Sequence, residues 1–172
     1  MKLFDIKYDS KTETIQLVYP NKKTEILADD APSKPIKSSD NKKAVYISPL
    51  EWECYGNLYL VNLEKGEQEI LVAPDNQFIP KNVIWLDNKY VLVIIGFGDG
   101  TVAVGGNIYV VNIDTKDKIQ VTKYDEHIQI TDLFINDGML YYKGIKYIDD
   151  NSIKSNIYEN KMELSSITAA TN

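Results

Sequence analysis

The sequence predicts an all-β protein of repeated four-stranded antiparallel meanders, arranged as a partial β-propeller of three to four blades. Three observations predict this fold. A short segment recurs about every 50 residues, Asp- and Asn-containing turns separate short apolar runs, and those runs alternate or are continuous. β-branched and aromatic residues dominate the runs, and no long stretch has the 3.6-residue period of a helix. We expect the last residues, 168–172, to be frayed.

The clearest repeat is a nine-residue strand. Residues 56–64 read GNLYLVNLE and residues 106–114 read GNIYVVNID, with five of nine positions identical. A third, more divergent copy, SNIYEN, occupies residues 155–160. Tyr59, Tyr109 and Tyr158 hold one position of this repeat, which indicates packing in the core and not a ligand cage.

Each copy is preceded by a hairpin and followed by a polar turn and another strand. The hairpin turns contain Asp or Asn, which tolerate left-handed backbone conformations, and Asp137-Gly138 is the clearest case. One unit is thus four short strands, the form of a propeller blade. We predict one domain over residues 1–172, with a half unit and three blade-like units at 2–28, 37–75, 82–124 and 129–168.

These units resemble the blades of TolB-like and related bacterial propellers. In those blades an Asp-Gly/Asn-Lys turn precedes one strand, and a Gly-Asn-(Leu/Ile)-Tyr segment forms the next strand but one. Over residues 37–165 the chain resembles a bacterial domain family of unknown function found largely in low-GC Gram-positive bacteria. The resemblance implies the architecture and carries no assigned activity.

Composition excludes several functions. The net charge is −6 and the sequence contains no arginine, so neither nucleic acid nor an anionic membrane surface is an expected partner. No apolar stretch is long enough to insert into a membrane, and residues 1–5 do not begin a signal peptide. We therefore expect a cytoplasmic protein from the sequence as given, or an extracytoplasmic one if an upstream anchor or signal was removed.

The segment that interrupts the repeat is the candidate ligand-binding site. Glu51 and Glu53 flank Trp52, with Tyr55 close behind, and carboxylates beside aromatics are typical of sugar-processing sites. The same residues also fit an exposed loop whose aromatics pack against a blade edge, which we favour. Asp99, in the glycine-rich segment 96–106, completes the candidate set.

Other motifs favour ordinary structural roles. The glycine-rich segment is followed by an expected strand, whereas a phosphate loop must open a helix, so we predict a long hairpin. Cys54 and His127 are the single cysteine and histidine, and nothing in the sequence places them together. We predict no catalytic residue, no metal site and no cofactor.

The most favoured function is a non-enzymatic module that binds a protein or a glycan. The alternatives are a carboxylate-dependent hydrolase or lyase acting on carbohydrate, and a purely structural domain of a larger surface protein. Closed propellers need at least four blades, so this chain cannot close a full ring by itself. We expect residues 2–19 to pair with the last unit, which favours a monomer over a homodimer.

Overall fold

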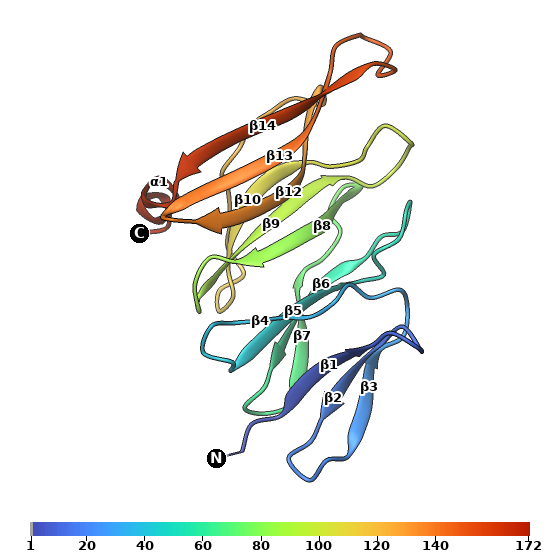
Figure 1. Ribbon diagram of the computed structural model, residues 1–172, viewed down its shortest axis with the longest axis vertical. Helices are drawn as coiled ribbons and strands as arrows, with labels where there is room; N and C mark the ends of the chain where they lie inside the picture. The colour runs from blue at the N-terminus through green and yellow to red at the C-terminus, as the bar shows by residue number, and fades with distance from the viewer. Residues whose placement is uncertain (1) are drawn as a thin grey trace.

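The computed structural model describes residues 2–172, which form four antiparallel sheets and one short helix (Figure 1). The elements, in chain order, are β1 (Asp5–Asp9), β2 (Thr14–Val18), β3 (Thr24–Ala28), β4 (Ile36–Lys37), β5 (Lys43–Ser48), β6 (Asn57–Asn62), β7 (Glu67–Val72), β8 (Phe78–Trp85), β9 (Tyr90–Phe97), β10 (Asn107–Asn112), β11 (Lys118–Gln120), β12 (Ile128–Asn136), β13 (Met139–Tyr147), β14 (Ser155–Glu163) and α1 (Leu164–Thr171).

Each sheet is a meander in which neighbouring strands are consecutive in the chain. The sheets contain β1–β3, β4–β7, β8–β11 and β12–β14. Turn residues with positive φ allow the tight reversals, as at Asp137 (51°) and Gly138 (74°) between β12 and β13. The predicted all-β fold of repeated meanders in an open, propeller-like arrangement is therefore confirmed.

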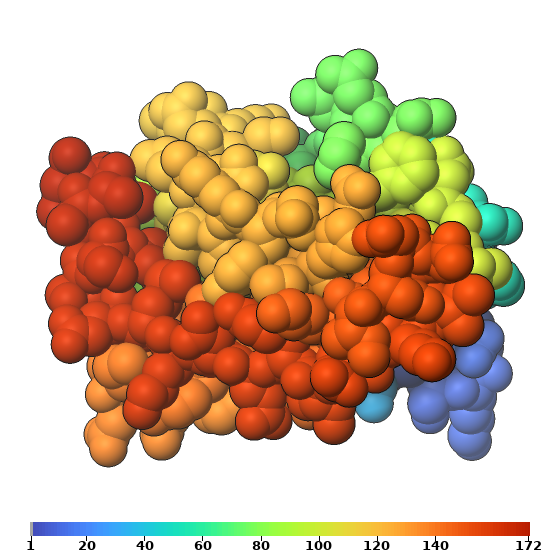
Figure 2. All heavy atoms as spheres, turned by 90° about the horizontal axis from the view of Figure 1, so that it is seen from above, coloured from blue at the N-terminus to red at the C-terminus, as the bar shows by residue number. Residues whose placement is uncertain are grey.

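The predicted pairing of residues 2–19 with the last unit is wrong. β1 pairs with β2 inside the first sheet, and β14 pairs with β13 inside the last. Figure 1 shows these two sheets at opposite ends of the molecule. The first unit has three strands of its own, so its inner strands find partners locally, and the arc stays open. Figure 2 shows the last sheet from outside, with no other sheet over it.

Apolar side chains pack between consecutive sheets and form three successive layers of core. The central strands β5 and β9 are buried along nearly their whole length because sheets cover both of their faces. This explains why they are continuous apolar runs instead of alternating ones. In the layer between the third and fourth sheets, α1 contributes Ile167, which is 2% exposed. The helix extends to Thr171, so the expected fraying of 168–172 is wrong for most of that segment.

The recurring tyrosines of the repeat strands pack against the core as predicted, but they are only partly buried. Leu58 and Ile108 are completely buried, whereas Tyr59 and Tyr109 are only partly buried. Side chains alternate across a strand, so Leu58 and Ile108 each belong to one core layer while the tyrosine next to each packs against the neighbouring layer. Tyr59 still packs, because its ring stacks on that of Tyr46 with 5.0 Å between centroids.

This arrangement predicts unequal costs for truncating neighbouring side chains of β10. Ile108→Ala should lower the free energy of unfolding by about 2–5 kcal/mol, as for a fully buried aliphatic side chain. Tyr109→Ala should cost about 1–3 kcal/mol, less than deleting a fully buried aromatic. Urea unfolding followed by circular dichroism measures both. A larger loss for Tyr109→Ala than for Ile108→Ala would contradict the register of the structure.

Candidate functional site

In an antiparallel meander, successive connections lie alternately at the two ends of the strands. The connections of all four sheets therefore gather on two opposite sides of the stack of sheets. We call one end the acidic end and define it by the connections 10–13, 29–35, 49–56, 73–77, 98–106, 121–127 and 148–154. Hydrogen bonds between connections join this end together, such as those from the Leu50 amide to the Ala31 carbonyl (2.8 Å) and from the Gly98 amide to the Gln77 carbonyl (2.8 Å). In Figure 1 it forms the right-hand side of the molecule.

Charge is distributed very unevenly between the two ends. The connections of the acidic end contain eleven carboxylates and four lysines. The connections at the opposite end, 19–23, 38–42, 63–66, 86–89, 113–117 and 137–138, contain six carboxylates and six lysines. The acidic end therefore accounts for the negative net charge of the chain. Its carboxylates are those of Glu13, Asp29, Asp30, Glu51, Glu53, Asp75, Asp99, Asp125, Glu126, Asp149 and Asp150.

Exposed apolar side chains gather at the same end. Trp52 is 69% exposed and Ile153 is 77% exposed, although both are large and apolar. Phe78 and Phe97, at the strand ends beside these connections, meet edge to face with 6.0 Å between centroids. The other exposed apolar residues of these connections are Leu50, Tyr55, Val102, Val104 and Ile148. Large apolar groups concentrated in one region of a surface are typical of a binding site.

The structure brings together three of the five candidate residues. The Gly100 amide donates to Glu53 Oε1 at 3.3 Å, which links the 49–56 and 98–106 connections. Asp99, as a hydrogen-bond acceptor for the Tyr55 hydroxyl, raises the pKa of that tyrosine. Glu51 and Trp52 lie in the same connection and are exposed at the rim of a cavity, without a side-chain hydrogen bond to the other three candidates in the described part of the chain.

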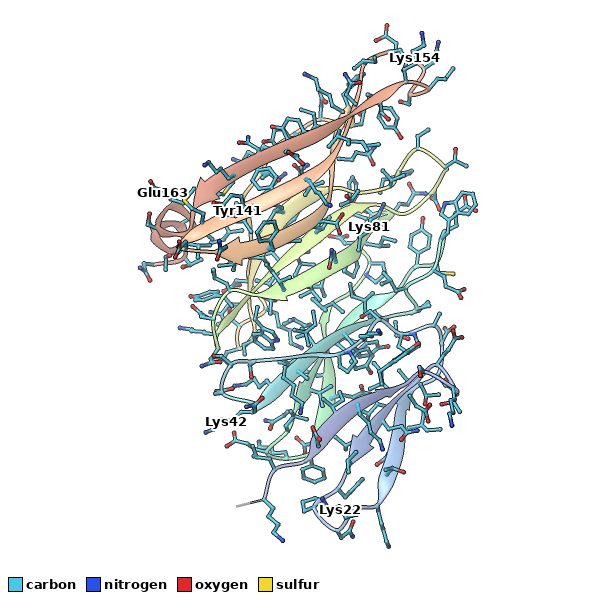
Figure 3. The ribbon with its side chains drawn as sticks, viewed as in Figure 1. Lys22, Lys42, Lys81, Tyr141, Lys154 and Glu163 are labelled. Carbon is cyan, nitrogen blue, oxygen red and sulfur yellow. The ribbon has the colours of Figure 1, made fainter. Side chains whose placement is uncertain are left out.

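A cavity of about 350 Å³ lies between the 49–56 and 98–106 connections. Lys81, near the start of β8, forms part of its lining, and its Nζ donates to the Ala103 carbonyl at 2.5 Å. Partial burial away from water lowers the pKa of Lys81 to about 8. Figure 3 labels this lysine beside the connections.

Lys81 was missed by the sequence reasoning. A β-bulge between Pro80 and Asn82 breaks the pairing of β8 with β9 at this residue. Bulges re-aim side chains, so this lysine does not follow the alternation of its strand. The only signal in the sequence was Pro80 itself, because proline inside a strand pattern marks an edge or a bulge.

A second cavity, of about 580 Å³, lies on the other side of the 98–106 connection. Aromatic side chains from three strands and one connection line it, together with the carboxylates of Asp99, Asp125 and Glu126. No lysine is among its lining residues in the described part of the chain. The cavity therefore combines apolar walls with negative charge. Its aromatic residues are Phe78, Phe97, Tyr109 and Tyr124.

Gln129 holds the glycine-rich connection against the last sheet. Its Oε1 accepts the Gly105 amide at 3.0 Å, and its Nε2 donates to the carbonyls of Val102 (2.9 Å) and Glu126 (3.1 Å). A Cβ on Gly105 would lie 2.2 Å from the carbonyl oxygen of Ile130, so a side chain cannot fit there. β9 and β10 pair on either side of the connection, which is the predicted hairpin.

The remaining candidates stay apart. Cys54 lines the smaller cavity, whereas His127 Nδ1 lies 3.4 Å from Asp125 Oδ1. Within residues 2–172, His, Cys, Asp and Glu side chains form no group of three that could hold a metal ion. In the same residues no helix is long and apolar enough to cross a membrane.

The fold and its connections define an open, propeller-like β-domain with a loop-lined acidic end. A family model described as a domain of unknown function, DUF4652, matches residues 50–165. The match covers well over half of the chain, so the protein belongs to this family. A search of curated proteins found no match to this chain.

Solved structures share the fold. A "putative conserved lipoprotein" from Clostridium novyi NT is 23% identical, with a TM-score of 0.72, covering 95% of this chain and 97% of that one. TolB from Acinetobacter baumannii is 16% identical, with a TM-score of 0.51, covering 94% of this chain and 41% of TolB. The β-propeller domain of the Trilobed protease from Pyrococcus furiosus, described as having an open velcro topology, is 13% identical, with a TM-score of 0.50, covering 92% and 52%.

Gln129→Leu should destabilise the fold by about 2–4 kcal/mol, because it leaves a buried amide and two carbonyls without their partner. Hydrogen exchange should show faster exchange of the Gly105 amide in this variant than in the wild type. Gln16→Leu is the matched control, since Gln16 lies on β2 in the first sheet, far along the chain from the connection. Unchanged exchange at Gly105 would mean that Gln129 does not hold the connection.

Lys81→Met should change how stability depends on pH. The folded chain binds the Lys81 proton less tightly than the unfolded chain does, so this residue makes wild-type stability rise as pH increases from about 7 to 9.5. The methionine variant lacks this rise. If its free energy of unfolding exceeds that of wild type at pH 7, the difference should be smaller at pH 9.5. Urea unfolding at both pH values measures the difference. Glu51, Glu53 and Cys54 line the same cavity and are present in both proteins.

If the stability difference between wild type and Lys81→Met were the same at both pH values, Lys81 would not be desolvated in the fold. Lys154→Met provides a control for the loss of one lysine. Lys154 is exposed in the 148–154 connection, so its replacement should leave the pH dependence of wild type unchanged.

Proposed function

We propose that the protein is a non-enzymatic interaction module that binds a polypeptide partner through its acidic end. One observation carries the proposal: the carboxylate excess and more than half of the large exposed apolar side chains, including Trp52 and Ile153, occur at the same end of the strands. The opposite end has balanced charge in its connections. A surface that was only required to be soluble would not need large apolar groups among its carboxylates.

The two features have complementary roles in binding. Carboxylates around an interface attract a positively charged partner and speed its approach. Apolar and aromatic side chains such as Trp52 then lose contact with water when the partner docks, which supplies most of the affinity. The partner is therefore a polypeptide that presents lysine or arginine beside apolar side chains.

The larger cavity fits one part of such a partner. Asp99, Asp125 and Glu126 can pair with a basic side chain, while Phe78 and Tyr109 provide rings for its aliphatic stem or its charged head. No lysine of the lining competes for these carboxylates. We assign this cavity to the basic side chain of the partner.

A polypeptide fits this surface better than a glycan. Leu50, Val102, Val104, Ile148 and Ile153 are aliphatic, and a polar sugar would leave them without matching contacts. The hydrolase or lyase alternative has less support. The carboxylate of Glu53 already accepts a hydrogen bond from the Gly100 amide, which ties it to the neighbouring connection. The lipoprotein description of the Clostridium novyi NT structure supports a cell-surface setting for this module.

Site-specific photo-cross-linking tests the proposal. A photoreactive phenylalanine analogue at Trp52, Val102 or Ile153 should capture the same protein in cells, whereas one at Ile26 or Ile119 should not. The purified partner should then bind the chain with an affinity that falls as salt rises. Replacing Asp99, Asp125 and Glu126 by the neutral amides should weaken binding by about tenfold or more. The matched control replaces Asp40, Asp87 and Asp114 at the opposite end and should leave affinity unchanged.

Equal capture from both ends, or different proteins from the three positions, would overturn the proposal. Binding of the purified chain to a glycan array tests the alternative ligand, a carbohydrate. Binding to a defined glycan that is lost in Trp52→Ala, without any protein adduct, would assign the acidic end to carbohydrate. No adduct and no glycan would favour a purely structural domain.

A further inference from the structure

We propose that the cavity between the 49–56 and 98–106 connections binds a carboxylate carried on an apolar body, with Lys81 as its anchoring cation. The proposal rests on this cavity and its lysine and does not require the polypeptide partner proposed above. The ligand is a small apolar monocarboxylic acid or the C-terminal residue of a peptide, which offer the same chemistry.

The Lys81 ammonium has hydrogen-bonding capacity to spare. An ammonium has three N–H donors, and the described contacts of Lys81 Nζ are limited to the Ala103 carbonyl, a neutral acceptor. The lysine ion pairs in residues 2–172 join Lys37 to Asp5, Lys42 to Glu64, and Lys116 to Glu69, so none of them involves Lys81. Its charge is partly removed from water with no carboxylate at ion-pair distance among the described residues, although Glu51 and Glu53 line the same cavity.

Such a charge is costly, and a ligand carboxylate would offset the cost. Partial desolvation without a counterion disfavours the charged form, which agrees with the lowered pKa of this lysine. The bulge beside Pro80 sets the backbone from which Lys81 projects, so the cation is held in place before a ligand arrives. A preorganised cation loses less entropy on binding than a flexible surface lysine does.

The lining determines the rest of the ligand. Pro49, Leu50, Trp52, Ile79 and Val104 give the cavity apolar walls, which fit an apolar body. Its volume of about 350 Å³ is at the lower end of ligand sites, so the body is one aromatic or branched aliphatic group.

A phosphate does not suit this cavity. Phosphate sites usually combine several backbone amides or an arginine, and this chain has no arginine. The carboxylates of Glu51 and Glu53 also belong to the lining and would repel a dianion more strongly than a monoanion. A monoanion therefore suits the single lysine of the lining better than a dianion, and its carboxylate must lie beside Lys81 and away from Glu51 and Glu53.

Nuclear magnetic resonance titration tests the proposal with 3-phenylpropionate as the probe and 3-phenylpropionamide as its neutral control. The acid should shift the backbone amides of Ile79, Lys81, Asn82 and residues 98–104 in a saturable way, and the neutral amide should bind about tenfold more weakly or not at all. Lys81→Met should weaken binding of the acid by about tenfold, whereas Lys154→Met should bind it like wild type. Figure 3 labels both lysines.

A measurement on wild type avoids reliance on a variant that fails to fold. With unmodified lysines labelled with carbon-13, the Lys81 Cε resonance should titrate at higher pH when 3-phenylpropionate is bound. Glu51, Glu53 and Cys54, which face the same cavity, are unchanged in this comparison. A Lys81 titration that does not move with saturating acid, or equal affinity for the acid and its amide, would overturn the proposal.

Two further probes distinguish the sources of the carboxylate. The peptide acetyl-Ala-Ala-Phe with a free C-terminus is compared with 3-phenylpropionate. Binding about tenfold tighter than the small acid would assign the cavity to a peptide C-terminus. Equal or weaker binding would assign it to a free monocarboxylic acid. Cross-linking at Ile153 reports only on the polypeptide partner, so failure of that proposal leaves these results interpretable.

Discussion

The structure depends on apolar packing between consecutive sheets. Each of the two middle sheets is covered on both faces, which is why the residues of β5 and β9 are almost all buried and apolar. Three layers of core hold four sheets in fixed order. Because the strands in each sheet run alternately, this packing also brings the 49–56, 98–106 and 148–154 connections to one end. The acidic end therefore exists because core packing fixes the positions of the sheets whose connections form it.

Much of the fold could be predicted because its signals are local. Repeated Gly-Asn strands, Asp-Gly turns and the absence of helical periodicity all act within a few residues, and they gave the meanders correctly. The pairing of the N-terminal segment could not be read in this way, since it depends on which distant strand competes for β1. The degree of burial of Tyr59 could not be predicted either, since it depends on how completely the neighbouring sheet covers that side chain.

The candidate site was visible only in part. Glu53, Tyr55 and Asp99 were found because unusual residues interrupt a repeat, and the structure places them together through the Gly100 amide and the Tyr55 hydroxyl. Lys81 carried no such signal. Its importance arises from a bulge in β8 and from two connections that fold over it, and both require the tertiary structure. The charge difference between the two ends of the strands could not be seen in the sequence either, because acidic and balanced connections alternate along the chain and are sorted only by folding.

The open arc has a consequence for how the protein unfolds. Each sheet touches only its neighbours, as repeats do in a solenoid, so stability is carried by a series of nearest-neighbour interfaces. The first and last sheets each have one such interface and can detach while the others remain folded. A partner that spans the connections of three sheets would bridge two interfaces at once. Binding at the acidic end would therefore couple the melting of sheets that otherwise separate one by one, and the arc would unfold as a single unit.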